Sequence, residues 1–197
     1  RLESYIGRVN LTLFKNYLLT ASIRRDASSK FSPDTRVGYF PAVAAAWKLK
    51  DEFFANKNVL SELKLRLGWG ITGQQDGISY YPYLPRYAQI TNTAQYQFGN
   101  TFYSFLRPAA YDSKIKWETT TTSNIGLDFG FLNNRISGSV DVYMKKTKDL
   151  LSVIPVAPGS NFDITLLTNV GNMENKGIEF TINTTPVKTK DITWEFG

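Results

Sequence analysis

Residues 62–72 read Glu-Leu-Lys-Leu-Arg-Leu-Gly-Trp-Gly-Ile-Thr, and this stretch decides the fold class. Apolar side chains occupy every second position from Leu63 to Ile71, and charged or small residues occupy the positions between them. Successive side chains of a strand point to opposite faces of a sheet, whereas a helix would spread the same residues around its circumference. The stretch therefore predicts a strand with one apolar face and one polar face.

The same alternation recurs along most of the chain. We expect eight strands, which lie within residues 4–14, 17–25, 37–49, 62–72, 117–131, 135–146, 176–185 and 191–197. A short helical turn is expected within 52–60, and no long amphipathic helix is expected. Aromatic residues near the strand ends are typical of the girdles at membrane interfaces; they are Tyr5, Tyr17, Tyr39, Trp47, Trp117 and Trp194.

The connections between the expected strands differ in length in a regular way. Compact turns are expected near residues 15–16, 132–134 and 186–190, whereas 73–116 and 147–174 are long. In an up-and-down meander alternate connections lie at the same end, so one end carries turns and the other carries loops. This asymmetry, with a polar face that suits a water-filled or plugged lumen, favours an antiparallel, all-β transmembrane barrel over a soluble β-sandwich.

The composition excludes several classes of site. The chain has 197 residues, a formal net charge of +6, and neither histidine nor cysteine. A Ser-His-Asp triad, a cysteine nucleophile, a disulfide framework and a cysteine-type zinc site are therefore excluded. We expect no metal and no cofactor, and an enzyme would have to use carboxylate, lysine, tyrosine, serine or threonine side chains. Lysine and arginine are scattered rather than clustered, so nucleic acid is not an expected partner.

Eight stretches of the chain share one resemblance, and they are residues 17–31, 38–43, 46–49, 63–74, 116–120, 124–130, 145–151 and 169–179. These stretches resemble the SusC/RagA family of TonB-dependent outer-membrane transporters. They follow the order of the family, and together they are specific.

The resemblance implies a transport function in the bacterial outer membrane, with no covalent chemistry and no enzymatic activity. It implies that residues 1–197 are about eight strands of a larger barrel, typically of 22 strands, without the plug domain. Residues 73–116 and 147–174 would be extracellular loops. The implied partners are a SusD-like surface lipoprotein, the TonB complex (through missing N-terminal parts), outer-membrane lipid and an oligosaccharide or peptide substrate.

Two other interpretations stay open at this point. The chain could form a complete eight-stranded outer-membrane barrel that serves as an anchor or adhesin, because eight strands can close around side chains. It could also be a soluble β-sandwich that acts as a binding module.

The long connection 73–116 supplies the first group of candidate site residues. Aromatic faces stack on sugars, and a tyrosine hydroxyl adds a hydrogen bond, so these rings could contact a ligand or a partner protein. They could equally pack a small core of the loop itself, because loops of this length are rarely ordered otherwise. The candidates are Tyr80, Tyr81, Tyr83, Tyr87, Tyr96 and Tyr103.

The second group comprises Arg24, Arg25 and Asp26 at the end of an expected strand. They could form a binding cluster or a gate. The alternative is a local network of ion pairs at the barrel rim. Asp128, Asp141 and Lys145 are expected to line the polar interior rather than to act as catalysts.

Overall fold

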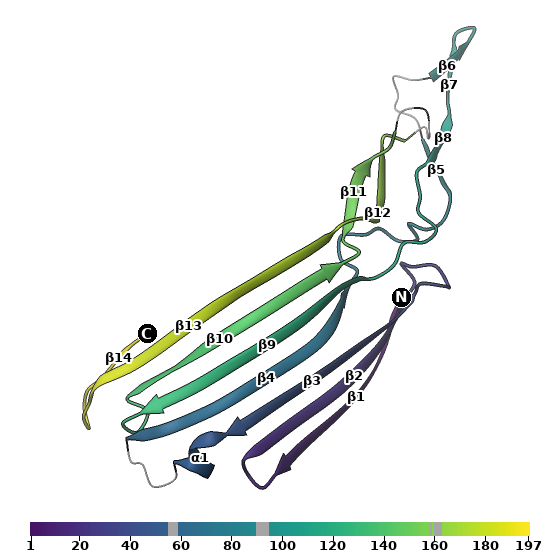
Figure 1. Ribbon diagram of the computed structural model, residues 1–197. Coiled ribbons are helices and arrows are strands. Elements are labelled where there is room, and N and C mark those ends of the chain that lie inside the picture. The colour runs from purple at the N-terminus through teal and green to yellow at the C-terminus, as the bar shows by residue number, and fades with distance from the viewer. Residues whose placement is uncertain (55–58, 90–94, 158, 160–162) are drawn as a thin grey trace.

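The computed structural model describes residues 1–54, 59–89, 95–157, 159 and 163–197. Its main feature is one antiparallel sheet of eight strands in the order β1-β2-β3-β4-β9-β10-β13-β14 (Figure 1). The fold class and the eight strands expected from the sequence are confirmed. The strands are β1 (Leu2–Leu13), β2 (Tyr17–Ser28), β3 (Val37–Lys48), β4 (Leu60–Gln74), β9 (Glu118–Phe131), β10 (Ile136–Lys148), β13 (Asn172–Lys188) and β14 (Thr193–Phe196).

The connections of the sheet divide into two kinds, one at each end. The short-turn end carries the connections 14–16, 132–135 and 189–192, together with the five-residue helix α1 (Leu49–Phe53). Left-handed backbone at Leu132, Asn133 and Asn134, with φ of 52°, 55° and 61°, reverses the chain within a few residues. The helical turn expected within 52–60 is displaced toward the N-terminus, because the observed helix α1 ends at Phe53. Residues 55–58 lie outside the described residues.

The long-loop end carries the connections 29–36, 75–117 and 149–171. Two of these contain further hairpins that project away from the main sheet (Figure 1). The sequence pattern did not predict these short strands. They are β5 (Arg86–Gln89) paired with β8 (Leu106–Ala109), β6 (Gln95–Phe98) paired with β7 (Thr101–Ser104), and β11 (Leu151–Pro155) paired with β12 (Thr165–Asn169).

The register gives the sheet two chemically different faces. One row across seven strands contains Leu11, Leu19, Ala45, Leu67, Ile125, Val142 and Ile178. The adjacent row, which points the other way, contains Asn10, Thr20, Ala44, Gly68, Asn124, Tyr143 and Gly177. We call these the apolar face and the polar face. Because side chains alternate along each strand, this register repeats the difference along the whole sheet.

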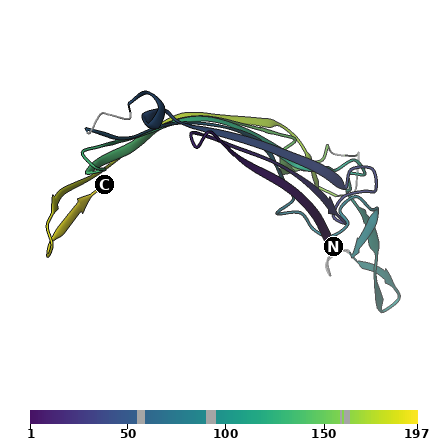
Figure 2. The same cartoon turned by 90° about the horizontal axis from the view of Figure 1, so that it is seen from below.

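The apolar face is uncovered, and the sheet is open. Many of its large side chains are exposed, with Ile178 at 75%. Among the described residues no second sheet packs on this face, as a sandwich would require, and β1 and β14 each pair with a single neighbour. Figure 2 shows the sheet as an arched layer. The arrangement is that of a segment of a barrel wall, and neither a sandwich nor a closed eight-stranded barrel is present in these described ranges.

No helix in the described ranges is long and apolar enough to span a membrane.

Helix α1 is held against the short-turn end by one carboxylate. Tyr17 Oη donates to both carboxylate oxygens of Glu52, at 3.2 and 3.1 Å, and Trp47 Nε1 donates to Glu52 Oε2 at 2.8 Å. The Tyr17 and Trp47 rings stack with centroids 5.6 Å apart. Phe53 packs edge-on against Trp47 with centroids 5.8 Å apart. Two aromatic side chains near a strand end thus have their polar tips satisfied by the protein.

Replacement of Glu52 with alanine in the full-length protein is expected to loosen α1. The variant loses the hydrogen bonds from both Tyr17 and Trp47 and keeps the ring contact between Phe53 and Trp47. We expect faster amide hydrogen exchange in residues 49–54, measured by mass spectrometry. Asp51→Ala removes the neighbouring carboxylate and leaves these bonds intact, so equal exchange in the two variants would contradict the prediction.

Candidate functional site

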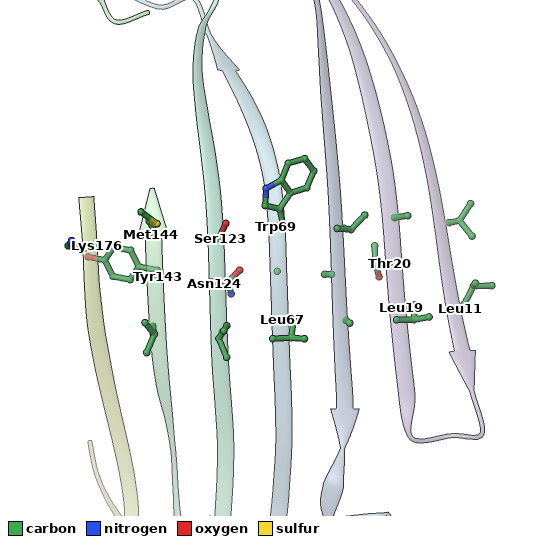
Figure 3. Close-up of a pocket in the computed structure, with 18 residues that line it drawn as sticks. Leu11, Leu19, Thr20, Leu67, Trp69, Ser123, Asn124, Tyr143, Met144 and Lys176 are labelled. Atoms are coloured by element: carbon green, nitrogen blue, oxygen red, sulfur yellow. The ribbon is translucent and has the colours of Figure 1, made fainter. Parts of the chain in front are cut away.

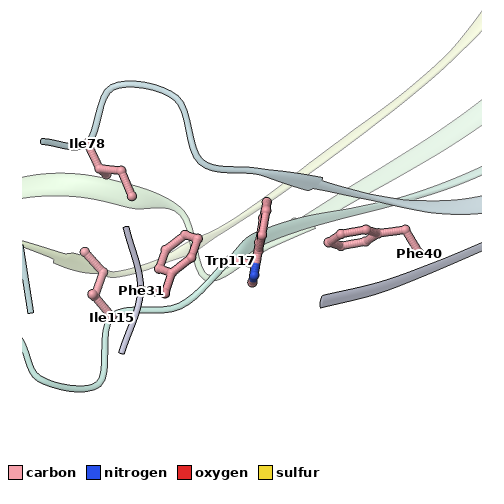
Figure 4. Close-up of a cluster of buried hydrophobic side chains, with 5 residues drawn as sticks. All are labelled: Phe31, Phe40, Ile78, Ile115 and Trp117. Carbon is pink, nitrogen blue, oxygen red and sulfur yellow. The ribbon is translucent and has the colours of Figure 1, made fainter. Parts of the chain in front are cut away.

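A small hydrophobic cluster closes the long-loop end of the sheet, and we call it the roof cluster (Figure 4). Phe31 and Ile115 are fully buried, at 0% exposure. The Trp117 ring lies between two phenylalanine rings, with its centroid 5.0 Å from Phe31 and 5.4 Å from Phe40. The five members of the cluster are Phe31, Phe40, Ile78, Ile115 and Trp117. The cluster therefore ties the connections 29–36 and 75–117 to the top of β3.

Trp117 was expected in an interfacial girdle, and that expectation is wrong. It is 7% exposed, and its Nε1 donates to the carbonyl oxygen of Arg36 at 3.0 Å. Trp117 precedes the first residue of β9, so the strand alternation that placed it on the apolar face does not extend to it. The loop instead turns the indole into the roof cluster.

Phe40 reaches the roof cluster because the neighbouring positions have no side chains. Its ring lies so close to Gly38 and Gly73 that a Cβ added at either glycine would overlap the ring. Glycine in a strand interior often marks such a close approach. Phe40 follows Tyr39 in the strand, and it therefore points to the opposite face.

The three consecutive rim residues do not form one cluster. Arg24 and Asp26 share the polar face and form an ion pair, in which Arg24 Nε donates to Asp26 Oδ2 at 2.8 Å. Arg25 points to the apolar face, where its guanidinium lies 6.0 Å from the centre of the Tyr5 ring. The alternation of β2 separates Arg25 from its two neighbours.

A pocket of about 220 Å³ opens beside the Arg24–Asp26 pair. Asp26 is 5% exposed, and its Oδ1 has no hydrogen-bond partner among the described residues. The same is true of Gln75 Oε1. Buried oxygens of this kind ordinarily bind water or a ligand donor. The pocket lining is Leu2, Arg24, Asp26, Gly73, Gln74, Gln75, Asp76 and Trp117.

Gln75 was not predicted as a site residue. The signal available for it was the polar run Gln74-Gln75-Asp76 directly after a strand. The pairing across the sheet, which the sequence did not give, brings this run to Asp26. The pocket is lined by Arg24 and Asp26 of β2 on one side and by the residues at and after the end of β4 on the other.

The six candidate tyrosines are divided among separate places. Tyr80 and Tyr87 are each 71% exposed, and Tyr81 is about half exposed. Tyr83 packs against the roof cluster and also meets Tyr81, with ring centroids 6.3 Å apart. Tyr83 therefore supports the loop, whereas Tyr80 and Tyr87 present free rings.

Tyr96 and Tyr103 lie farther out, in the β6–β7 hairpin. They oppose each other in the register, and both are more than half exposed. Each also meets a phenylalanine, since Tyr96 packs edge-on against Phe105 at 5.3 Å and Tyr103 packs against Phe98 at 5.9 Å. The hairpin thus packs some of its own aromatic surface and exposes the rest.

A network of charges crosses the polar face nearer the short-turn end. Asp128 accepts from Lys64 at 3.0 Å and pairs with Arg66 at 2.7 Å, and Arg66 also pairs with Asp141 at 2.9 Å. Gly126 lies between Arg66 and Asp141 in the register, because it pairs with both. The absence of a side chain at Gly126 lets the guanidinium and the carboxylate meet across an intervening strand. We call these four charged residues the polar-face network.

No three acidic side chains in the described part of the chain are placed to hold a metal ion together.

This sheet, apolar on one face and charged on the other, defines a segment of a large β-barrel wall with elaborated loops at one end. Residues 3–197 match the family described as TonB dependent receptor-like, beta-barrel, and the chain belongs to that family. The chain is 52% identical over 195 residues to the TonB-dependent receptor SusC of Bacteroides thetaiotaomicron. The aligned region covers 98% of this chain and 19% of that relative.

Two further relatives agree with this assignment. The TonB-dependent receptor P26 of Formosa agariphila is 36% identical over 197 residues, which covers 99% of the chain and 19% of the relative. The structure of the RagAB peptide importer in its closed-closed state matches with a TM-score of 0.84 and 28% identity, over 96% of this chain and 20% of that chain. The chain therefore spans about a fifth of the length of the proteins it matches.

Proposed function

We propose that the chain forms part of the barrel of a bacterial outer-membrane transporter that imports an oligosaccharide or peptide nutrient with energy from TonB. The observation that carries the proposal is the 52% identity to the TonB-dependent receptor SusC over 98% of the chain. The two-faced sheet supports it, because an apolar band faces lipid in such barrels and the lumen is polar. No covalent chemistry is part of this function.

In this proposal the long-loop end faces the outside of the cell. The connections expected as the loops 73–116 and 147–174 capture the substrate together with a SusD-like surface lipoprotein. The exposed rings of Tyr80 and Tyr87 suit stacking on sugar rings or on apolar peptide side chains. The hydroxyl group of each tyrosine stays available for a hydrogen bond to the substrate. The pocket beside Asp26 and Gln75 would then receive hydroxyl or amide donors at the mouth of the lumen.

The polar-face network would face the lumen, where the plug domain of such transporters lies. Energy-coupled movement of the plug, driven through the TonB complex, would release the substrate past this wall. The chain contributes the wall and the loops, and the parts that contact TonB would come from the rest of the protein.

The proposal is tested with the full-length protein expressed in a strain that lacks its own copy. Uptake of labelled oligosaccharides and labelled oligopeptides is measured in separate arms, with and without a functional TonB complex. We expect uptake in at least one arm, and we expect it to disappear without TonB. Uptake that persists without TonB, or absence of uptake in both arms while the protein is present in the outer membrane, would contradict the proposal.

The ligand-contact role of the loop is tested by the Tyr80→Ala, Tyr87→Ala double variant. Loss of two stacking surfaces is expected to reduce uptake at low substrate concentration about tenfold. Tyr39→Ala is the matched control, since Tyr39 is also exposed but lies on the apolar face of β3. The ligand-contact role is wrong if the double variant and the control take up substrate equally well at equal surface abundance.

A further inference from the structure

Three lysines lie together on the apolar face at its long-loop end. Lys146 and Lys148 are on β10, and Lys176 is on the neighbouring strand β13. Val142, Met144, Lys146 and Lys148 occupy successive positions of this face along β10, and Lys148 lies opposite Thr119 of β9. Above the apolar band the face therefore changes from aliphatic to cationic side chains over a single step of the alternation.

Glu174 is the one acidic residue described between these lysines on the two strands, and it bridges two of them. Its Oε2 lies 3.5 Å from Lys146 Nζ, and its Oε1 lies 3.8 Å from Lys176 Nζ. The Lys176 side chain is 77% exposed. Three lysines and one glutamate leave a net charge of +2 at this place, and the ammonium groups are free to bind further anionic oxygens.

An apolar groove of about 780 Å³ runs across seven strands and reaches the row of the sheet that contains Lys176 (Figure 3). Lys176 lines one end of it, next to Met144 of β10. Most of the remaining lining is aliphatic or aromatic, including Val142, Ile125, Leu67, Trp69 and Leu19. Its polar members are Thr20, Ser123 and Asn124. A ligand that contacts both the three lysines and the apolar groove needs long apolar chains joined to a negatively charged head group.

We propose that Lys146, Lys148 and Lys176 bind the phosphates of lipopolysaccharide, and that the groove seats its acyl chains. This inference rests on the proposed outer-membrane location. Lipopolysaccharide is favoured over a phospholipid because the lysines lie at the long-loop end, which faces the external leaflet in that location. Lipopolysaccharide occupies the external leaflet, and each molecule combines phosphates with several acyl chains.

Charge complementarity makes the role of Glu174 opposite to that of the lysines. Its carboxylate holds Lys146 and Lys176 near each other, but it also repels a bound phosphate at short range. Removal of the lysine charges should therefore weaken lipid binding, and removal of the Glu174 charge should strengthen it. A purely structural role for these residues would give loss of stability in both cases and no such change of sign.

The test uses the full-length protein purified in detergent, with lipid A as the probe. Binding is followed by native mass spectrometry and by fluorescence titration, with phosphatidylglycerol in a parallel arm. The Lys146→Gln, Lys148→Gln, Lys176→Gln triple variant is expected to bind lipid A at least tenfold more weakly. Glu174→Gln is expected to bind it severalfold more tightly, and both differences are expected to shrink as the salt concentration rises.

Lys145→Gln is the matched control, because Lys145 is adjacent to Lys146 on β10 but points to the polar face. Its lipid A affinity is expected to equal that of the unaltered protein. Electrophoretic mobility of unheated samples confirms that each variant is folded. The proposal is overturned if the triple variant binds lipid A as tightly as the Lys145→Gln control, if Glu174→Gln binds it more weakly, or if phosphatidylglycerol binds the lysine site more tightly than lipid A. Since this assay needs no uptake, its failure is separate from a failure of the transport proposal.

Discussion

Replacement of Phe31 with alanine in the full-length protein is expected to lower the free energy of opening of the long-loop end by about 3–5 kcal/mol. Phe31 is 0% exposed and packs against Trp117 with ring centroids 5.0 Å apart. The substitution leaves a cavity at the centre of the roof cluster, where four partners meet from three separate segments. The sheet below the cluster does not depend on this contact, so the effect should stay local.

The measurement is amide hydrogen exchange in residues 29–36 and 110–117, which we expect to become faster by about two orders of magnitude or more. Phe102→Ala is the control, because Phe102 is 58% exposed in the β6–β7 hairpin and should change exchange little. Unchanged protection of residues 29–36 in Phe31→Ala would show that the roof cluster does not hold the loops. A change spread evenly over β9 and β10 would show that the effect is not local.

Replacement of Gly126 with valine is expected to be the most damaging change on the polar face. A Cβ at this position would overlap Asp141 Oδ1 and would lie 2.8 Å from Arg66 Nη2. The guanidinium and the carboxylate could then no longer meet across the strand, and Asp128 and Asp141 would lose their shared partner. Overpacking together with a broken, partly buried ion pair is expected to destabilise the protein by about 2–4 kcal/mol.

Gly7→Val is the matched control for this change. A Cβ at Gly7 would meet only Ile23 Cγ2, at 4.0 Å, and valine suits a strand. We expect Gly126→Val to lower the melting temperature of the detergent-solubilised protein by several degrees, and Gly7→Val to leave it nearly unchanged. Equal melting temperatures for the two variants would mean that the network tolerates a side chain at Gly126.

The main sheet could be predicted because one physical signal repeats in all of its strands. Leu63 to Ile71 alternate cleanly, and the same is true of Ile125 to Phe131. The boundaries were less accurate where the chain nears the long-loop end. β13 begins at Asn172, whereas the sequence pattern placed its start near residue 176. The prediction missed the run Asn172-Met173-Glu174-Asn175 because this run is polar on the face that was expected to be apolar. Above the apolar band the alternation no longer marks the strand, although the backbone pairing continues.

The site was less predictable, because it depends on contacts between strands. The hydrogen-bonded neighbours of Arg66 are known only once the register places Gly126 beside it. The short hairpins β5–β8 and β6–β7 were not predicted, since four residues are too few to establish an alternation. Arg25 could have been separated from Arg24 and Asp26 from the alternation alone, whereas the closeness of Asp26 and Gln75 could not have been inferred from their spacing in the sequence.

The order of the strands has a consequence for how the wall is built. The strands of the main sheet are neighbours in the same order as they follow one another along the chain, from β1 to β14. The short strands in the two long loops pair only with one another. The wall can therefore form one strand at a time. Each new strand pairs with the free edge of the strand before it, and no earlier pair has to open. The loop hairpins are free to fold independently while this edge advances, so insertions in them need not disturb the register of the wall.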